Sequence, residues 1–381
     1  MAYNIETKCI HLENDKQACD KSGAISYPIY QTATFAHLAL GKSTGYDYTR
    51  LQNPTKQHVE DVVADLEGGV GSISCSSGMA AIATTMELFK PGDSIIVDED
   101  LYGGTVRLFL NISEKNGLEI IRVDLHRDDV RKYIKENTKA IFFETPTNPM
   151  MNVIDIEEIT KIAKENDLLT IVDNTFLSPY LQNPIKLGAD LVIHSGTKYL
   201  GGHNDVLAGF VVASTQELLE KLQYIVNTIG PCLSPLDSWL VLRGIKTLAI
   251  RVDRAQENAL ALAKWLKGRE EVTRVIYPGL EEHPGHEIMK KQARGFGAML
   301  TFEVKDKALV KKVIENLSVI QYAESLGGVE SLITYPITQT HADVPPEMLA
   351  KNGITDRVLR LSVGIENVND LIADFERAFN A

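Results

Sequence analysis

The sequence contains little of what marks several large classes of protein. Only four of its 381 residues are cysteines (Cys9, Cys19, Cys75 and Cys232), and no two of them form a C-x-x-C pair. Such sparse cysteines are typical of a reducing compartment and offer no zinc site, so we expect a cytoplasmic protein without a bound metal. No apolar run approaches membrane-spanning length, and no basic segment followed by an apolar stretch opens the chain, so we expect neither a membrane span nor a signal peptide.

Positive charge is also scarce. The formal net charge is −12, and no basic run offsets it, which disfavours nucleic acid and anionic membrane surfaces as partners. Hydrophobic residues at 44% and charged residues at 24% are ordinary values for a globular protein and argue against disordered or fibrous classes. Because the chain is long for a single core, we expect two domains.

Strand and helix signals alternate from residue 53 onwards. Asn53-Pro54 begins a helix with an N-cap and a first-turn proline, and Gly68-Gly69 ends it. Short apolar strands are expected at 72–75, 94–97, 118–123, 140–143, 170–172, 191–194 and 210–212. Helical segments lie between most of them, which predicts an α/β fold with a mainly parallel sheet covered on both faces. In such a sheet the ligand lies beyond the carboxyl ends of the strands.

Three regions are expected along the chain. Residues 1–52 lack strong periodicity and are interpreted as an N-terminal arm that packs on something, such as another subunit. Residues 53–244 form the large, ligand-binding domain. Residues 245–381 contain the connector helix and a smaller α/β C-terminal domain. The connector belongs to one long helical region that is expected over roughly 235–267.

The most informative segment is 189–203, an apolar strand that leads into small hydroxyl residues and then Lys198. Burial lowers the pKa of a lysine towards a nucleophilic free amine suited to Schiff-base chemistry. A second strand, 169–172, ends in Asp173. A Schiff-base lysine and a carboxylate for a pyridinium nitrogen are the two groups that pyridoxal phosphate needs most. Either residue alone favours an ordinary buried ion pair, but together with the phosphate signals they predict this cofactor.

Several short polar segments could bind the phosphate and the ring. Ser195 and Thr197 are short donors suited to phosphate oxygens, and the turn 76–79 joins a strand to a helix whose first amides face an anion. Tyr102 follows another strand and could stack on a flat ring, although core packing is the commoner role of a tyrosine. Arg50 is either a phosphate ligand or a solvated surface charge. Arg360 lies inside an apolar strand, where a substrate carboxylate would supply the partner it needs.

These segments resemble a known family when they are taken in order. They are Tyr-Thr-Arg-Leu-Gln-Asn-Pro-Thr (48–55), Ser-Ser-Gly-Met (76–79), Tyr-Gly-Gly-Thr (102–105), Glu-Thr-Pro-Thr-Asn-Pro (144–149), Val-Asp-Asn-Thr-Phe (172–176), His-Ser-Gly-Thr-Lys-Tyr-Leu-Gly-Gly-His (194–203), Glu-Ser-Leu-Gly-Gly-Val-Glu-Ser-Leu (324–332) and Arg-Leu-Ser-Val-Gly-Ile-Glu (360–366). The chain resembles the cysteine/methionine-metabolism (transsulfuration) branch of the fold-type-I, aspartate-aminotransferase-like enzymes that use pyridoxal 5′-phosphate.

The resemblance implies a role for each matching residue. It implies that Lys198 binds the cofactor covalently and moves protons, and that Tyr102 stacks on the ring and assists as acid or base. The implied cofactor-binding set is Tyr48, Arg50, Gly78, Met79, Tyr102, Asp173, Ser195, Thr197 and Lys198, with Tyr48 and Arg50 reaching the cofactor of a neighbouring subunit. The implied substrate-binding set is Asp47, Arg107, Asn148, Glu324, Ser325 and Arg360. A homotetramer built from two active dimers follows from the same resemblance.

The reaction within this branch depends on few residues. An acidic residue at the position of Glu324 resembles the γ-acting cystathionine enzymes, and Arg107 fits the same group, whereas β-lyases and methionine lyases tend to be apolar or aromatic there. With Asp47, Glu324 could bind the distal ammonium of cystathionine; alternatively both are solvated loop charges. We therefore expect cystathionine γ-lyase activity, with γ-synthase from an O-acylhomoserine and cysteine as the first alternative. Cystathionine β-lyase and methionine γ-lyase come next.

Other classes of protein fit the sequence less well. The glycine-rich segment 68–71 follows a helix and precedes a strand, the reverse of a dinucleotide-binding fingerprint. His283 and His286 flank Pro284-Gly285 in an expected loop rather than on an H-E-x-x-H helix, which disfavours a metal hydrolase. A non-catalytic sensor that only binds the cofactor would not need Tyr102, Lys198 and Arg360 together.

Overall fold

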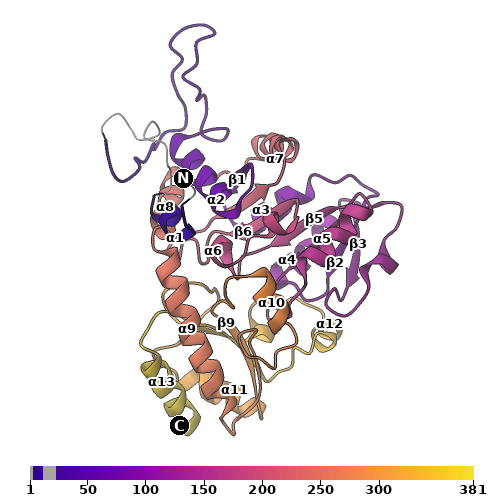
Figure 1. The fold of residues 1–381 in the computed structure, drawn as a ribbon, viewed down its shortest axis with the longest axis vertical. Helices are drawn as coiled ribbons and strands as arrows, with labels where there is room; N and C mark the ends of the chain where they lie inside the picture. Colours follow the sequence, from indigo (N-terminus) through magenta and orange to yellow (C-terminus); the bar gives the residue numbers. More distant parts are fainter. Residues whose placement is uncertain (1–2, 12–22) are drawn as a thin grey trace.

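The computed structural model describes residues 3–11 and 23–381 (Figure 1). Residues 1–2 and 12–22, which belong to the expected arm and include Cys19, lie outside the described residues. The α-helices are α1 (Ile5–Ile10), α2 (Pro54–Glu67), α3 (Gly78–Met86), α4 (Gly103–Leu108), α5 (Ile156–Glu165), α6 (Ser178–Leu181), α7 (Gln216–Ile229), α8 (Pro235–Ile245), α9 (Leu248–Lys267), α10 (His286–Gln292), α11 (Lys307–Asn316), α12 (Pro346–Lys351) and α13 (Val368–Asn380).

The strands form two sheets. They are β1 (Gly71–Cys75), β2 (Ser94–Asp98), β3 (Glu119–Val123), β4 (Thr138–Glu144), β5 (Leu169–Asp173), β6 (Leu191–Ser195), β7 (Gly209–Ala213), β8 (Val272–Ile276), β9 (Met299–Val304), β10 (Gln321–Tyr322), β11 (Leu332–Thr334) and β12 (Val358–Ser362). The large sheet has seven strands in the order β1-β7-β6-β5-β4-β2-β3, and the small sheet has five in the order β10-β11-β12-β9-β8.

The large sheet is mainly parallel, as expected. Strands β3, β2, β4, β5 and β6 run parallel to one another, and β7 is antiparallel to both β6 and β1. Successive residues of each strand contribute to two separate hydrophobic clusters, so both faces are buried. Helices α3 and α7 pack on one face, whereas α2 and α5 pack on the other. The carboxyl ends of β4, β5 and β6 therefore meet at one edge.

Helix α2 forms for the reasons that the sequence gives. The side chain of Asn53 accepts hydrogen bonds from the backbone amides of Thr55 and Lys56, and Pro54 occupies the first helical position. Gly68 ends the helix in the left-handed conformation, with φ of 90°. The last residue of α2, Glu67, lies beside the ends of β5 and β6, where it contacts Asn174 and His194.

The connector consists of two helices rather than the single one expected. In a continuous helix, the carbonyl of Gly244 would accept a hydrogen bond from the backbone amide four residues later, that of Leu248. Instead, this carbonyl accepts hydrogen bonds from the guanidinium of Arg251 at 2.8 Å and from the amide of Thr247 at 3.1 Å. Helix α8 therefore ends at Ile245, and α9 begins anew at Leu248 and runs down to the small sheet (Figure 1).

The small sheet forms the second layer, with α9, α11 and α13 packed against it. It is antiparallel except for the short β10–β11 pair. Strands β8, β10 and β11 were not expected from the sequence, and His286 begins helix α10 instead of lying in a loop. The two sheets agree with an arrangement of a large and a small domain, but the boundaries after residues 52 and 244 stay predictions.

The described part of the arm consists of residues 3–11, where α1 packs against α2 and α9, and of a longer segment, residues 23–52, that projects away from both sheets (Figure 1). The backbone of this longer segment makes only isolated bridges, such as that between Thr34 and Tyr48. Apolar side chains on it face outward, with Ile25 94% and Leu38 78% exposed. In the parts of the chain that the structure describes, no helix is long and apolar enough to cross a membrane.

Candidate active site

A cavity of about 350 Å³ lies where the large sheet, α3 and the loop before β11 meet. Eleven of the fifteen side chains implied by the sequence line it: Gly78, Met79, Tyr102, Asn148, Asp173, Ser195, Thr197, Lys198, Glu324, Ser325 and Arg360. They come from segments up to 282 residues apart in the chain, between Gly78 and Arg360. The cavity lies beyond the carboxyl ends of the parallel strands, where a ligand of such a sheet is expected.

Lys198 is a lysine with a reactive environment. It follows β6, and its Nζ donates a hydrogen bond to the Oγ of Ser325 at 2.9 Å. Burial, and then the positive charge of Arg360, lower the pKa of the amine to about 8, while Glu324 raises it slightly. About a tenth of Lys198 is thus unprotonated at neutral pH, far more than for an ordinary lysine, as a nucleophilic lysine requires.

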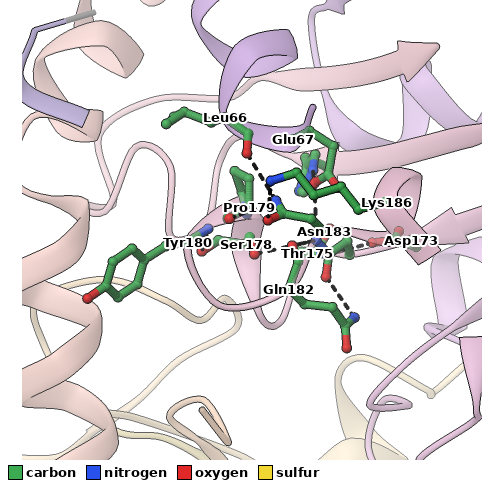
Figure 2. Close-up of polar contacts among 12 residues, drawn as sticks. Leu66, Glu67, Asp173, Thr175, Ser178, Pro179, Tyr180, Gln182, Asn183 and Lys186 are labelled. Carbon is green, nitrogen blue, oxygen red and sulfur yellow. Dashed lines mark hydrogen bonds and ion pairs between the residues drawn. The ribbon is translucent and has the colours of Figure 1, made fainter. Parts of the chain in front are cut away.

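Asp173 ends β5 on the cavity wall, next to Thr175 (Figure 2). Its Oδ1 accepts a hydrogen bond from the backbone amide of Thr175 at 2.9 Å. The hydroxyl of Thr175 in turn accepts one from the amide of Ser195 at 2.9 Å, which ties the ends of β5 and β6 together. Burial raises the pKa of Asp173. A cation placed against this carboxylate would favour its ionised form.

The first turn of α3 and the end of β6 form a close-packed cradle. A Cβ on Gly78 would meet the Cβ of Ser195 at 2.8 Å and its Oγ at 2.9 Å, so only glycine allows this approach. Ser77 caps α3 by accepting a hydrogen bond from the amide of Ala80 at 3.1 Å. The amides at the start of α3 and the hydroxyls of Ser195 and Thr197 therefore converge on one side of the cavity, an arrangement suited to a phosphate.

Tyr102 lies above this cradle. Its ring crosses the backbone of Gly104 so closely that a Cβ there would meet the ring at 2.5 Å and the Sδ of Met79 at 3.1 Å. The absence of a side chain on Gly104 leaves room for the ring at the start of α4. Tyr102 is thus held where it could stack on a planar ligand.

Arg360 is a buried cation in β12, with only 1% of its surface exposed. Its guanidinium donates to the Oδ1 of Asn148 at 3.0 Å and to the backbone carbonyl of Ser325 at 3.0 Å. No carboxylate pairs with it in the described residues, and its Nε lies buried without a hydrogen-bond partner. A buried guanidinium in this state is suited to bind a carboxylate from a ligand.

Four of the implied site residues do not line the cavity of their own chain. Asp47, Tyr48 and Arg50 belong to the arm, where Asp47 pairs with His37 at 2.8 Å and Arg50 lies 5.4 Å from the centre of the Tyr48 ring. Arg107 lies in α4, after the cavity residue Tyr102, and forms an exposed ion pair with Asp343. Their roles therefore stay predictions.

Some cavity residues were missed by the sequence reasoning. Glu144 ends β4 opposite Asp173 in the strand register, and its carboxylate accepts a hydrogen bond from the amide of Asn148 at 3.1 Å. Thr175 stands two residues after Asp173 and could have been found from that spacing. Thr340 reaches the cavity from a distant loop, and no local pattern marks it.

The cavity fits pyridoxal 5′-phosphate on three observations. The lack of a Cβ on Gly78 brings the first amides of α3 against Ser195, and Asp173 presents a buried carboxylate to the same cavity. Lys198 supplies a free amine between them. We propose that Gly78, Met79, Ser195 and Thr197 hold the phosphate and that Asp173 holds the ring nitrogen.

Comparisons with known proteins agree with this reading. Residues 6–380 match the family described as Cys/Met metabolism PLP-dependent enzyme. The chain is 50% identical to a cystathionine beta-lyase of Lactococcus lactis over 98% of both chains. It is 49% identical to a cystathionine gamma-synthase/O-acetylhomoserine (thiol)-lyase of Bacillus subtilis, over 99% of this chain and 97% of the relative. Its structure resembles that of a cystathionine gamma-lyase from Lactobacillus plantarum complexed with L-serine, with a TM-score of 0.95, 45% identity and 99% of both chains covered.

These comparisons confirm three predictions made from the sequence. The fold is that of the fold-type-I enzymes, the cofactor is pyridoxal 5′-phosphate, and the protein is an enzyme of sulfur amino-acid metabolism. The relatives carry three different activities, so the exact reaction is not decided by them. The chain belongs to the Cys/Met metabolism family of pyridoxal phosphate-dependent enzymes.

Proposed function

We propose that the protein cleaves cystathionine at its γ-carbon, so that cystathionine and water yield cysteine, 2-oxobutyrate and ammonia. The observation that carries this proposal is the placement of two opposite charges in one cavity. Arg360 is a buried cation without a carboxylate partner, and Glu324 is an exposed carboxylate at the same cavity. A substrate with a carboxylate at one end and an ammonium at the other would satisfy both.

The space around the cavity is long enough for such a substrate. A more open groove of about 550 Å³ adjoins it and shares Thr197, Leu207, Glu324 and Ser325 with it. The α-carboxylate would bind Arg360 and Asn148, and the distal ammonium would bind Glu324, where the cavity meets the groove. Cystathionine has an amino-acid group at each end and therefore suits both sites.

The residues of the chain supply the proton transfers. The bound cofactor withdraws electrons from the substrate and makes the hydrogen on its α-carbon acidic. Lys198, unprotonated in part because of burial, accepts this proton and can return it at the neighbouring carbon. Tyr102 stands on the same cavity wall and assists as acid or base when the sulfur departs. Arg360 holds the α-carboxylate fixed, which orients the α-hydrogen towards Lys198.

Cleavage at the β-carbon is the second candidate. The most similar curated relatives reported above include a cystathionine beta-lyase at 50% identity, and this reaction uses the same substrate and the same Lys198. The γ-synthase reaction is also compatible, because it shares the early steps and differs in whether water or cysteine takes up the unsaturated product. The presence of Glu324 is what leads us to prefer the γ-lyase.

Product analysis separates these reactions. Purified holoenzyme is given cystathionine alone, and the products are identified by mass spectrometry, with Lys198→Ala enzyme as the control. Cysteine with 2-oxobutyrate supports the proposal, whereas homocysteine with pyruvate means β-lyase. In a second mixture, efficient formation of cystathionine from an O-acylhomoserine and cysteine means γ-synthase. If no sulfur amino acid is turned over, the protein would instead be a non-catalytic sensor that only binds the cofactor, which is a different class of protein.

We further propose that two subunits build each active site and that two such dimers form a tetramer. The arm of one subunit would carry Tyr48 and Arg50 to the phosphate of the other. The exposure of Ile25, Leu38 and Leu40 supports this proposal, because apolar side chains on a projecting segment gain most from a partner surface. A cytoplasmic location stays a prediction from the composition.

Subunit mixing tests the shared site. Arg50→Ala and Lys198→Ala enzymes are each expected to be nearly inactive. After they are unfolded together and refolded in equal amounts, half of the dimers are hybrids, and each hybrid contains one site with both residues intact. About a quarter of wild-type activity should therefore return. If Arg50 served its own subunit, the mixture would stay as inactive as its parts.

A further inference from the structure

A buried carboxylate and a buried imidazole lie behind the cavity and take no part in lining it. Glu67 is the last residue of α2 and is 0% exposed, and His194 lies in β6 and is 1% exposed. The Nε2 of His194 and the Oε2 of Glu67 are 2.9 Å apart. Removing two ionisable groups from water is costly, so a pair of this kind calls for a reason beyond packing.

The pair is joined to the strand that carries Asp173. Asn174, the next residue, donates from its Nδ2 to Glu67 at 3.3 Å, and its backbone amide donates to the carbonyl of Ile193 at 2.9 Å. In the pairing of β5 with β6, Asp173 stands opposite Ile193, the residue before His194. Figure 2 draws Glu67, Thr175 and Asp173 within one cluster of polar contacts. Glu67 and His194 therefore lie directly beside the end of β5.

The arrangement is poor as a simple structural tether. Glu67 sits at the C-terminus of α2, where the helix carbonyls disfavour a negative charge. The Nδ1 of His194 is buried without a hydrogen-bond partner, and such an unpaired atom weakens the fold. A neutral amide at either position could join helix to strand without these penalties. Burial raises the pKa of Glu67, and the hydrogen bond and charge of His194 act against that rise. What an amide could not supply is a positive charge on the ring of His194, with a negative charge on Glu67 to stabilise it.

We propose that Glu67 and His194 are a positioning pair for the cofactor: charged His194, stabilised by Glu67, keeps Asp173 ionised so that Asp173 can hold a protonated pyridinium nitrogen. Successive residues of a strand point to opposite faces, so His194 and Asp173 project from opposite faces of the sheet, and the positive charge would act on Asp173 across the sheet edge. No hydrogen bond joins His194 to Asp173 in the described residues, so the effect acts through charge between neighbouring strands. Consistent with this, burial raises the pKa of Asp173 and the charge of His194 lowers it.

The neighbouring titratable groups do not replace the pair. Glu144 on β4 is a second carboxyl opposite Asp173, and burial, followed by the charge of Asp173, raises its pKa, so it supplies no positive charge. Lys186, in the 3-10 turn Pro184–Leu187, donates its Nζ to the Oδ1 of Asn183 at 3.2 Å. The inference rests on the cofactor and not on which carbon–sulfur bond is cleaved. It can therefore fail while the proposed reaction holds, and the reverse is also true.

The test compares His194→Gln, Glu67→Gln and the double variant with wild-type enzyme. His194→Gln removes the ring that the proposal charges, and Glu67→Gln removes the carboxylate that the proposal assigns to stabilise that charge. We expect each to weaken the binding of pyridoxal 5′-phosphate about 10-fold in equilibrium dialysis of apo-enzyme, which corresponds to about 1.4 kcal/mol. The double variant should be no weaker than either single one. The pH midpoint of the absorbance change of the bound cofactor should move about one pH unit upward. A ring without its positive charge withdraws fewer electrons from the linkage to Lys198.

The matched control is His286→Gln. His286 is also buried, and its Nδ1 bonds to the carbonyl of Pro278 at 2.8 Å, far from Asp173 in the chain. This control should lose stability without changing cofactor affinity. If His194→Gln and Glu67→Gln behave like it, with a lower unfolding midpoint but unchanged affinity and absorbance titration, the pair is a structural tether and the proposal fails.

A measurement on the unmodified holoenzyme covers variants that do not fold. Nitrogen NMR of enzyme labelled in its histidines reports whether the ring of His194 carries one proton or two. Two protons at neutral pH support the proposal. A neutral ring overturns it, because a neutral imidazole could not keep Asp173 ionised through charge.

Discussion

The Nζ of Lys198 donates a hydrogen bond to the Oγ of Ser325, and this contact joins the large sheet to the small one. Lys198 follows β6, whereas Ser325 lies in the loop between β10 and β11. The backbone carbonyl of Ser325 accepts a hydrogen bond from Arg360. Ser325 has a φ of 129°, which residues with side chains rarely adopt. Such strain is found where a structure places functional groups, and here it brings Ser325 into contact with both the Lys198 amine and the Arg360 guanidinium.

Lys198 should carry the cofactor covalently. Purified enzyme is expected to be yellow, and reduction with borohydride followed by peptide mapping should find the label on Lys198 alone. Its lowered pKa and its place between the Gly78 cradle and Asp173 are the reasons. A label on another lysine, or colourless wild-type enzyme after addition of the cofactor, would contradict the assignment.

The rate at which apo-enzyme takes up the cofactor should depend on the ionisation of Lys198. Only the neutral amine reacts, and its pKa is about 8 rather than 10.5. The rate is therefore expected to rise with pH, with a midpoint near 8, and to level off above it. Stopped-flow absorbance measures this directly. Glu324 raises this pKa, so Glu324→Gln should move the midpoint downward; a midpoint near 10.5 in both proteins would refute the environment described for Lys198.

Glu324 should contribute to cystathionine more than to substrates without a distal ammonium. A charge-assisted hydrogen bond at an exposed position is worth about 1.4 kcal/mol, so Glu324→Ala should lower kcat/KM for cystathionine about 10-fold. An S-alkylhomocysteine of similar length should be nearly unaffected. Glu330→Ala is the matched control, because Glu330 lines the outer groove but is already bonded to Asn204 at 2.7 Å. Equal losses on both substrates would show that Glu324 does not contact the ammonium.

Much of the fold and of the cofactor site could be predicted from the sequence because the signals are local. The caps of α2, the apolar strands and the polar residues after them each lie within a few neighbouring positions. Since parallel strands carry ligand groups at their carboxyl ends, Asp173, Lys198 and the turn 76–79 could be placed at one edge before the sheet order was known.

What could not be predicted depends on distant contacts. The break between α8 and α9 comes from Arg251, whose guanidinium takes the carbonyl of Gly244 and also that of Tyr199. The pairing of Glu67 with His194 spans 127 residues, and no sequence pattern near either residue predicts it. The short strands β10 and β11 also lack the alternation of apolar and polar residues that marks a strand. Their pairing within the small sheet is what holds them extended.

His341 should make the fold sensitive to acid. It is 2% exposed, and its Nε2 lies 3.1 Å from the carbonyl of Asn148. Burial, and then the charge of Arg360, lower the pKa of His341 from 6.5 to about 4. Between these values the unfolded chain binds a proton that the folded chain cannot bind, so the free energy of unfolding falls as the pH drops from 6.5 to 4.

Replacing His341 by glutamine should remove this part of the acid sensitivity. A shift of about 2.5 units corresponds to a free energy of the order of 3 kcal/mol, so apo-enzyme carrying His341→Gln should lose about that much less stability than wild type across the interval. Urea unfolding at a series of pH values measures the difference. The exposed His203 provides the control, because His203→Gln removes a histidine that burial does not constrain. Since His58 and His283 also have pKa values of about 4, the variant should retain part of the slope; curves parallel to wild type would mean that His341 takes up its proton as readily in the folded protein as in the unfolded one.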